Sequence, residues 1–188
     1  MQTLLHDQNC IRCPALVASR RRIVHGYGNP ASGIVFIGEA PGRHGADCTG
    51  IPFCGDRSGR ALRRMLVRLG LADTDAATAT LRCFITNAVR CCPPGNRTPT
   101  ALETRACASW LEAELDHIGP RLLVPVGRVA LQSIGTRYLG RDPGPIRALH
   151  ATTLHAGNVT IVPLIHPARI SCAATEAFVA TMRALMSG

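Results

Sequence analysis

The stretch of residues 34–59 constrains the fold most strongly, because an apolar run passes there directly into a polar, glycine-rich loop. The run Ile34–Ile37 consists of β-favouring residues and ends at Gly38. The loop carries Glu39 and Asp47 together with one aromatic residue, Phe53, and a helical pattern follows. Strand, loop and helix in this order present a ligand site beyond the carboxyl end of a parallel strand. Polar groups beside an aromatic ring suit a planar ligand such as a nucleobase; the alternative is a plain surface connection.

Strand-like and helix-like segments alternate along the rest of the chain. The expected strands are Ile34–Ile37, Cys83–Val89, Leu122–Val126 and Val159–Ile165. The expected helices are Ser58–Leu69, a segment from the capping residue Thr100 to about Ile118, Arg128–Ile134 and about Glu176–Met186. This alternation predicts an α/β protein with three α/β/α layers and a central, mostly parallel four-stranded sheet. With 188 residues and no repeat or linker, we expect one domain over residues 1–188.

The helical segments also predict which side chains face the core. In the first long helix the apolar stripe is Leu62, Met65, Leu66 and Leu69. The opposite face is expected to hold Arg60, Arg63, Arg64 and Arg68. In the second, the inward positions are expected to be Leu102, Ala106, Trp110, Leu111 and Leu115.

The charge balance indicates an anionic partner and excludes some chemistry. The formal net charge is +9, and the 21 basic residues are all arginine. Without lysine, neither a P-loop nor a side-chain Schiff base can operate. Guanidinium groups match phosphate geometry, so the surplus favours a nucleic-acid partner. The alternative is that GC-rich coding produces the arginine content.

No apolar run approaches the ~18 residues that a membrane span requires, and the N-terminus lacks the basic start and apolar core of a signal peptide. We therefore expect no membrane association. The expected location is the cytoplasm, with association to the nucleoid when the protein is bound to DNA.

Three expected strands end in polar side chains. Glu39 follows the first strand, Asn87 lies near the end of the second, and His166 follows the last. The carboxyl ends of parallel strands meet at one edge of a sheet, so these side chains are expected to converge there. Each taken singly has a plainer explanation as a locally satisfied loop residue.

The nine cysteines indicate a metal site rather than disulfides, because their number is odd and no signal peptide precedes them. Cys10 and Cys13 form a C-x-x-C pair. Cys91, or its neighbour Cys92, precedes Pro93-Pro94, and Cys91 is separated from Cys107 on the next helix by 15 residues. Four thiolates suffice for zinc or for a [4Fe–4S] cluster, and spacing alone does not choose between them. Buried free thiols are the alternative.

These motifs together resemble the uracil-DNA glycosylase superfamily over nearly the whole chain. The four cysteines and Gly38-Glu-Ala-Pro-Gly42 resemble family 4, the iron–sulfur enzymes, as do Phe84-Ile-Thr-Asn87 and His166-Pro-Ala168. The loop 43–59 is more similar to family 5, the group of broader specificity. The chain is thus a mosaic, with Ala40 where the family 1 enzymes hold a water-activating Asp.

The resemblance implies an enzyme that flips uracil out of DNA and hydrolyses its glycosidic bond, leaving an abasic site. It implies a uracil pocket, catalytic groups, DNA contacts and a structural [4Fe–4S] cluster, with zinc as the alternative metal. The uracil pocket would comprise Gly38, Glu39, Ala40, Phe53, Asn87 and His166. The catalytic groups would be Glu39, His166 and Asp47. DNA would be contacted by Arg43, Arg57, Arg97, Arg169 and the apolar wedge Ile170. The cluster would be held by Cys10, Cys13, Cys91 and Cys107.

The expected partner is DNA containing uracil or abasic sites, and the protein is expected to act as a monomer. Two other hypotheses stay open at this point. One is a uracil- or abasic-DNA binding protein of the same superfamily with weak turnover, motivated by Ala40 and the altered loop. The other is a metal-stapled nucleotide- or phosphate-binding protein unrelated to repair.

Overall fold

The computed structural model describes residues 9–76 and 79–187. Residues 1–8, which include most of the N-terminal stretch expected to lack a signal peptide, lie outside this range, as do residues 77–78 and residue 188. Among the described helices, none combines the length and the apolar character needed to cross a membrane.

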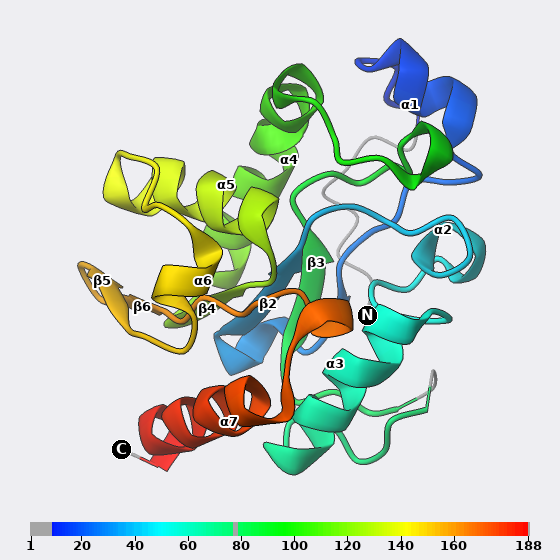
Figure 1. Ribbon diagram of the computed structural model, residues 1–188. Helices are drawn as coiled ribbons and strands as arrows, with labels where there is room; N and C mark the ends of the chain where they lie inside the picture. The colour runs from blue at the N-terminus through cyan, green and yellow to red at the C-terminus, as the bar shows by residue number, and fades with distance from the viewer. Residues whose placement is uncertain (1–8, 77–78, 188) are drawn as a thin grey trace.

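A six-stranded sheet in the order β1-β3-β2-β4-β6-β5 forms the centre of the molecule (Figure 1). Its parallel core consists of the four expected strands: β2 (Ile34–Gly38), β3 (Phe84–Asn87), β4 (Leu122–Pro125) and β6 (Val159–Ile161). Short antiparallel strands close the two edges, β1 (Tyr27–Gly28) on β3 and β5 (Leu154–Ala156) on β6. The mostly parallel α/β arrangement is confirmed, whereas the predicted number of four strands is wrong.

Neither edge strand was predicted, and both are very short. β1 contributes two residues from a segment rich in turn-forming residues. β5 and β6 form a hairpin around Gly157 and Asn158, with Gly157 at a φ of 58°. A Gly-Asn pair between two apolar runs is a hairpin signal, so this strand could have been found.

Helices cover both faces of the sheet, as the three-layer prediction requires (Figure 1). The side chains of β2 alternate between two cores: Ile34 and Phe36 pack with helices α3 (Arg57–Arg68) and α7 (Cys172–Ser187). Val35 and Ile37 pack on the other side with α4 (Ala101–Ile118) and α5 (Arg128–Leu139). A strand buried on both faces reads as a continuous apolar run, which is why the segment was recognisable.

Shorter helices complete the structure. They are α1 (Pro14–Ser19), α2 (Ala46–Thr49), α6 (Ile146–Leu149) and the 3-10 turns η1 (Pro30–Ser32), η2 (Pro94–Asn96) and η3 (Pro167–Arg169). Helix α5 extends beyond its predicted end at Ile134, and α7 begins before Glu176.

Two predicted helix faces need correction. Arg63 of α3 was expected on the arginine-rich outer face, but its side chain is buried, with a relative exposure of 2%. Leu102 of α4 was expected to face inward, yet it is 71% exposed. Leu111 and Leu115 are buried as predicted, and the buried face of α4 also includes Glu103, Cys107 and Glu114, whereas Ala106 and Trp110 are partly buried. Both helices bury charged residues that have specific polar partners, and an apolar periodicity cannot reveal such partners.

Candidate active site

The ends of β2 and β3 bring three candidate residues together. Gly38 and Asn87 are register partners at the carboxyl ends of these parallel strands. A Cβ atom built on Gly38 would lie 2.3 Å from Asn87 Oδ1 and 2.7 Å from ring atoms of Phe53. The Asn87 side chain and the Phe53 ring therefore converge above the Gly38 backbone, and only glycine leaves room for them.

His166 follows the last parallel strand and reaches the same edge of the sheet. It lies two residues beyond Leu164, which bridges to Val126 at the end of β4. A Cβ atom on Gly127 would be 3.8 Å from His166 Cδ2. The three predicted strand ends thus carry their polar groups along one edge, with Gly127 beside the imidazole.

The environment of His166 favours a neutral imidazole that donates through Nε2. The backbone N–H of Ala168 donates to His166 Nδ1 at 3.4 Å, which places the remaining proton on Nε2. Burial lowers the pKa of His166, and Arg169 lowers it further, whereas Asp56 acts in the opposite direction. A neutral ring in this tautomer can donate a hydrogen bond at neutral pH.

Glu39 lies directly after β2 with a half-buried side chain. Burial raises the pKa of Glu39, while a hydrogen bond from Thr98 and the charge of Arg169 lower it. The C=O of Glu39 accepts from the N–H of Val89 at 2.9 Å, so β2 and β3 stay paired beyond their assigned ends. Its neighbour Ala40 packs towards the cysteine-rich core rather than standing alone in solvent.

Asp47 occupies a different environment from Glu39. Its side chain is 1% exposed, and Asp47 Oδ1 accepts from the backbone N–H of Arg21 at 3.0 Å. Burial raises the pKa values of Cys91 and Cys92, and the charge of Asp47 raises both further. The hydrogen bond to Arg21 ties α2 to the N-terminal segment.

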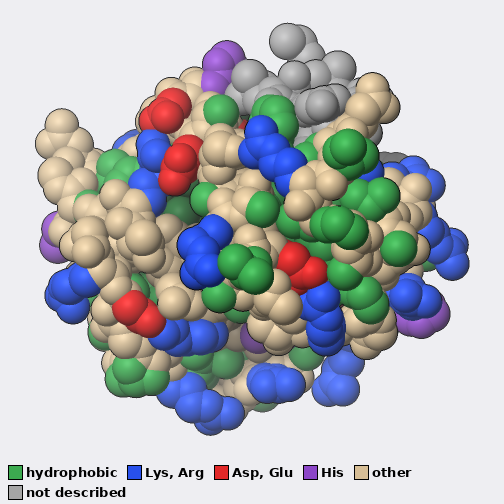
Figure 2. All heavy atoms as spheres, turned by 90° about the horizontal axis from the view of Figure 1, so that it is seen from above, with side chains coloured by type: hydrophobic (Ala, Val, Ile, Leu, Met, Phe, Trp, Pro, Cys, Tyr) green, Lys and Arg blue, Asp and Glu red, His purple; other side chains and the backbone are tan. Residues whose placement is uncertain are grey.

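The predicted DNA contacts divide into two groups. Arg43, Arg57 and Arg169 are exposed. Arg97 instead forms a bidentate ion pair with Glu103, with N–O distances of 2.8 and 2.7 Å. This contact lowers the pKa of Glu103 to about 2. Ile170 is partly buried against the core. Figure 2 shows the molecule from above. Arginine side chains gather along the lower border of this face, and hydrophobic side chains lie elsewhere on it.

The four predicted metal-ligating cysteines line one small pocket together with Leu16, Arg20 and Trp110. Arg20 Nη1 donates to Cys91 Sγ at 3.2 Å, and the backbone N–H of Arg90 donates to Cys107. Burial raises the pKa of Cys107 to about 11. Within residues 9–76 and 79–187, no group of three or more ligating side chains is already arranged to hold a metal. The donor set nevertheless fits a thiolate-bound metal, because the four cysteines line one pocket and N–H donors are directed at two of them.

A buried ion pair that sequence reasoning missed lies behind Asn87. Arg90 Nη2 is 2.6 Å from Glu114 Oε2, and both side chains are almost fully buried. Arg90 Nη1 also donates to the hydroxyl of Thr86, the residue before Asn87. Glu114 directly precedes Leu115 on the inward face of α4. This position is the only signal in the sequence that could have predicted the buried ion pair.

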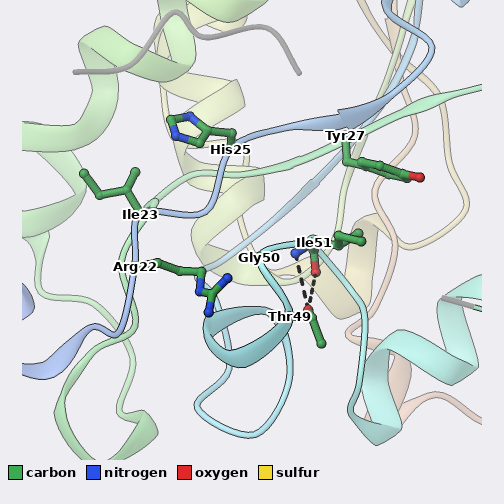
Figure 3. Close-up of a pocket in the computed structure, with 7 residues that line it drawn as sticks. All are labelled: Arg22, Ile23, His25, Tyr27, Thr49, Gly50 and Ile51. Atoms are coloured by element: carbon green, nitrogen blue, oxygen red, sulfur yellow. Dashed lines mark hydrogen bonds between the residues drawn. The ribbon is translucent and has the colours of Figure 1, made fainter. Parts of the chain in front are cut away.

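A cavity in the described part of the chain is lined by none of the predicted uracil-binding residues. It has a volume of about 560 Å³ and opens between segment 22–27 and the end of α2 (Figure 3). Its lining is Arg22, Ile23, His25, Tyr27, Thr49, Gly50 and Ile51. Ile51 belongs to the loop that carries Phe53 two residues later, so the same loop contributes to this cavity and to the candidate base pocket.

Comparison with known proteins identifies the family. The model of the uracil DNA glycosylase superfamily matches residues 25–186. A type-5 uracil-DNA glycosylase of Pyrobaculum aerophilum is 32% identical, covering 87% of this chain and 80% of the relative. A type-5 enzyme of Thermus thermophilus is 39% identical (73% of each chain), and a type-4 enzyme of Archaeoglobus fulgidus is 33% identical (86% and 78%). The chain, whose motifs resemble both types, belongs to the uracil-DNA glycosylase superfamily.

Proposed function

We propose that this protein is a monofunctional DNA repair glycosylase that hydrolytically excises uracil from DNA and leaves an abasic site. One observation carries the proposal: Asn87 and Phe53 converge on the backbone of Gly38, at the edge of the sheet where His166 follows the last parallel strand. The membership of the chain in the uracil-DNA glycosylase superfamily supports the same reaction.

The pocket has the groups needed to select uracil. A base inside a duplex cannot reach them, so it must be flipped out, at a cost of about a few kcal/mol in lost stacking and pairing. The Phe53 ring would stack on the flipped base, which is worth about 1–3 kcal/mol. The Asn87 amide would accept from uracil N3–H and donate to O4. Cytosine presents the reverse pattern and would leave the amide unpaired.

His166 and Glu39 would act on the bond that breaks. Cleavage leaves negative charge on uracil O2, and the Nε2–H of a neutral His166 would donate to that oxygen. Glu39, as a carboxylate, would orient the attacking water or stabilise the cationic sugar. Water adds its oxygen to C1′ and the uracil anion gains a proton. Asp47, held by the Arg21 amide, would shape the loop rather than take part directly.

DNA binding would rest mainly on the exposed arginines Arg43, Arg57 and Arg169, because Arg97 already forms an ion pair with Glu103. Ile170 would serve as the wedge only if it left its partly buried place on the core. We propose that the protein acts as a monomer.

Cys10, Cys13, Cys91 and Cys107 would hold a [4Fe–4S] cluster, with zinc as the alternative. When bound, this group would supply a structural staple between the N-terminal segment, the loop after β3 and helix α4. The N–H donors of Arg20 and Arg90 would stabilise the charged sulfurs.

A second candidate is a uracil- or abasic-DNA binding protein with weak turnover. Ala40 supports it, because this position offers no side chain that could activate water. The two functions differ in turnover: the binding protein would form a stable complex without releasing uracil repeatedly.

Release of free uracil from an oligonucleotide with one deoxyuridine tests the proposal. We expect repeated turnover on single- or double-stranded substrate, a loss of about 100-fold for Asn87→Ala, and no loss for Asn158→Ala in the β5–β6 turn. Hypoxanthine and xanthine at the same position measure substrate breadth. If folded protein binds the oligonucleotide tightly but releases no uracil, the binding function is correct, and no preference for DNA over mononucleotides would contradict both.

A further inference from the structure

The backbone of Phe53 adopts a conformation that an aromatic residue rarely takes. Its φ is 50°, and among the described non-glycine residues only Asn96 and Ala151 also have a positive φ. A bulky side chain in the left-handed region is strained and persists only where the surrounding structure holds it. The neighbours Pro52 and Cys54 are both buried, which leaves the loop little freedom to relax. Something in the structure therefore fixes the backbone from which the ring projects.

The first two turns of α3 provide the contacts that hold it. A Cβ atom on Gly59 would lie 2.4 Å from the carbonyl oxygen of Phe53, so glycine lets this carbonyl approach the helix closely. Arg63, one turn later on the same face, donates from Nε to the same oxygen at 3.1 Å. The Phe53 carbonyl therefore packs closely on Gly59 and accepts a hydrogen bond from Arg63, at two consecutive turns of α3.

The guanidinium of Arg63 is committed to the main chain. Its Nη1 donates to the carbonyl oxygen of Ala76 at 2.8 Å and its side chain is buried, while its Nη2 has no hydrogen-bond partner among the described residues. No carboxylate forms an ion pair with it within the described residues. A buried cation without a counter-charge is costly unless its donors are used, and leucine would fill a helix position beside a core at lower cost. The two hydrogen bonds from Nε and Nη1 to the carbonyls of Phe53 and Ala76 are the polar contacts that offset this cost.

The effect reaches the base pocket through the Phe53 ring. The ring atoms of Phe53 lie within 2.7 Å of the Cβ position of Gly38, beside Asn87. A change in the Phe53 peptide would move the ring away from this place. Since a flipped base must fit between the ring and the opposite wall, a shift of the ring would weaken binding of the reacting base but not binding of the DNA backbone.

We propose that Arg63 is a positioning residue for uracil excision: by holding the Phe53 carbonyl, it fixes the ring that stacks on the flipped base. This inference rests on the proposed function. It assigns a pocket role to a buried arginine on the helix whose other arginines face solvent, and that arginine does not touch the base itself.

A double-mutant cycle on the full-length protein tests this role. Single-turnover excision from a deoxyuridine oligonucleotide is measured for wild type, Arg63→Met, Phe53→Ala and the double variant. We expect Arg63→Met to slow the maximal rate about tenfold, within the range that loss of base stacking produces. In the Phe53→Ala background the same substitution should have almost no effect, because no ring is left to position. Arg63→Lys, which keeps one donor, should recover part of the rate.

Affinity for a uracil-free oligonucleotide separates positioning from phosphate binding and should be unchanged in Arg63→Met. Arg64→Met is the matched control, because it removes the same charge from an exposed neighbour on α3 and should leave the rate unchanged. If Arg63→Met does not fold, Arg63→Lys replaces it in the cycle, since lysine keeps the charge but cannot hold both carbonyls in the geometry of the guanidinium.

The outcomes distinguish the inference from the function on which it rests. A wild-type protein that excises nothing overturns the proposed function. An active protein in which Phe53→Ala has no effect overturns the stacking role. If Phe53→Ala slows excision but Arg63→Met slows it equally with and without the ring, the positioning role of Arg63 is wrong.

Discussion

The strand ends and the cysteine site lie four residues apart on one segment, yet the structure holds them in different ways. Asn87 ends β3, a strand whose four residues are all buried within the sheet. Cys91 lies in the loop after β3 and forms a small core with Leu16, Val89 and Cys107. The sheet itself positions Gly38 and Asn87 of the base pocket, whereas the cysteine site relies on few apolar contacts. This difference explains why a bound metal would serve as a staple there and not in the pocket.

Arg90 links the two regions, and its replacement should have the largest effect on stability. Arg90→Met leaves Glu114 buried without its ion pair, and breaking such a pair costs about 3–5 kcal/mol. Urea unfolding measures the loss. Arg137→Met is the control, because its partner Asp116 is exposed and the expected loss is below about 1 kcal/mol. Equal losses for the two variants would contradict the role given to the buried pair.

Substitutions in the base pocket should change the excision rate rather than the stability of the protein. His166→Ala should lower excision about 100- to 1,000-fold, the effect of removing one donor to a developing oxyanion. The thermal midpoint should stay close to that of wild type, because the ring is half-buried at the sheet edge. His155→Ala, an exposed histidine in β5, is the control. A loss of rate explained by unfolding would remove His166 from the reaction.

The cysteine side should show the opposite pattern. Cys107→Ser should lose the broad absorbance at about 400 nm expected of an iron–sulfur cluster. It should also be less stable, by about 2.7 kcal/mol if the wild-type protein binds its group at a hundred times the dissociation constant. The excision rate per folded molecule should not change. Cys172→Ser, an exposed thiol, is the control. A colourless wild-type protein that contains zinc would select the other metal.

The smallest expected effect is a shift in pH dependence. Arg169 lowers the pKa values of both Glu39 and His166. If the reaction needs an ionised Glu39 and a neutral His166, activity falls as the pH drops through these values. Arg169→Ala should raise both pKa values and move this acidic limb to higher pH. Arg57→Ala should weaken DNA binding but leave the limb in place; an identical profile for wild type and Arg169→Ala would contradict the assignment.

Sequence patterns predicted the parts of the molecule that the parallel sheet determines. The runs that became β2, β3, β4 and β6 are largely apolar, so the placement of Gly38, Asn87 and His166 at one edge followed from them, although β6 ends at Ile161 and not at the predicted Ile165. Side-chain pairing did not follow. Arg63 and Glu114 occupy buried helix positions because of partners distant in the sequence, and neither a helical period nor a spacing rule contains that information.

Selectivity between uracil and cytosine tests the central claim most directly, because it depends on the Asn87 amide at the end of β3. Wild-type protein is incubated with two oligonucleotides that differ only in deoxyuridine or deoxycytidine at one position, and the released base is measured. The account predicts repeated release of uracil, no detectable release of cytosine, and loss of uracil release in Asn87→Ala. Release of both bases at similar rates, or of neither by a folded protein that binds DNA, would contradict it.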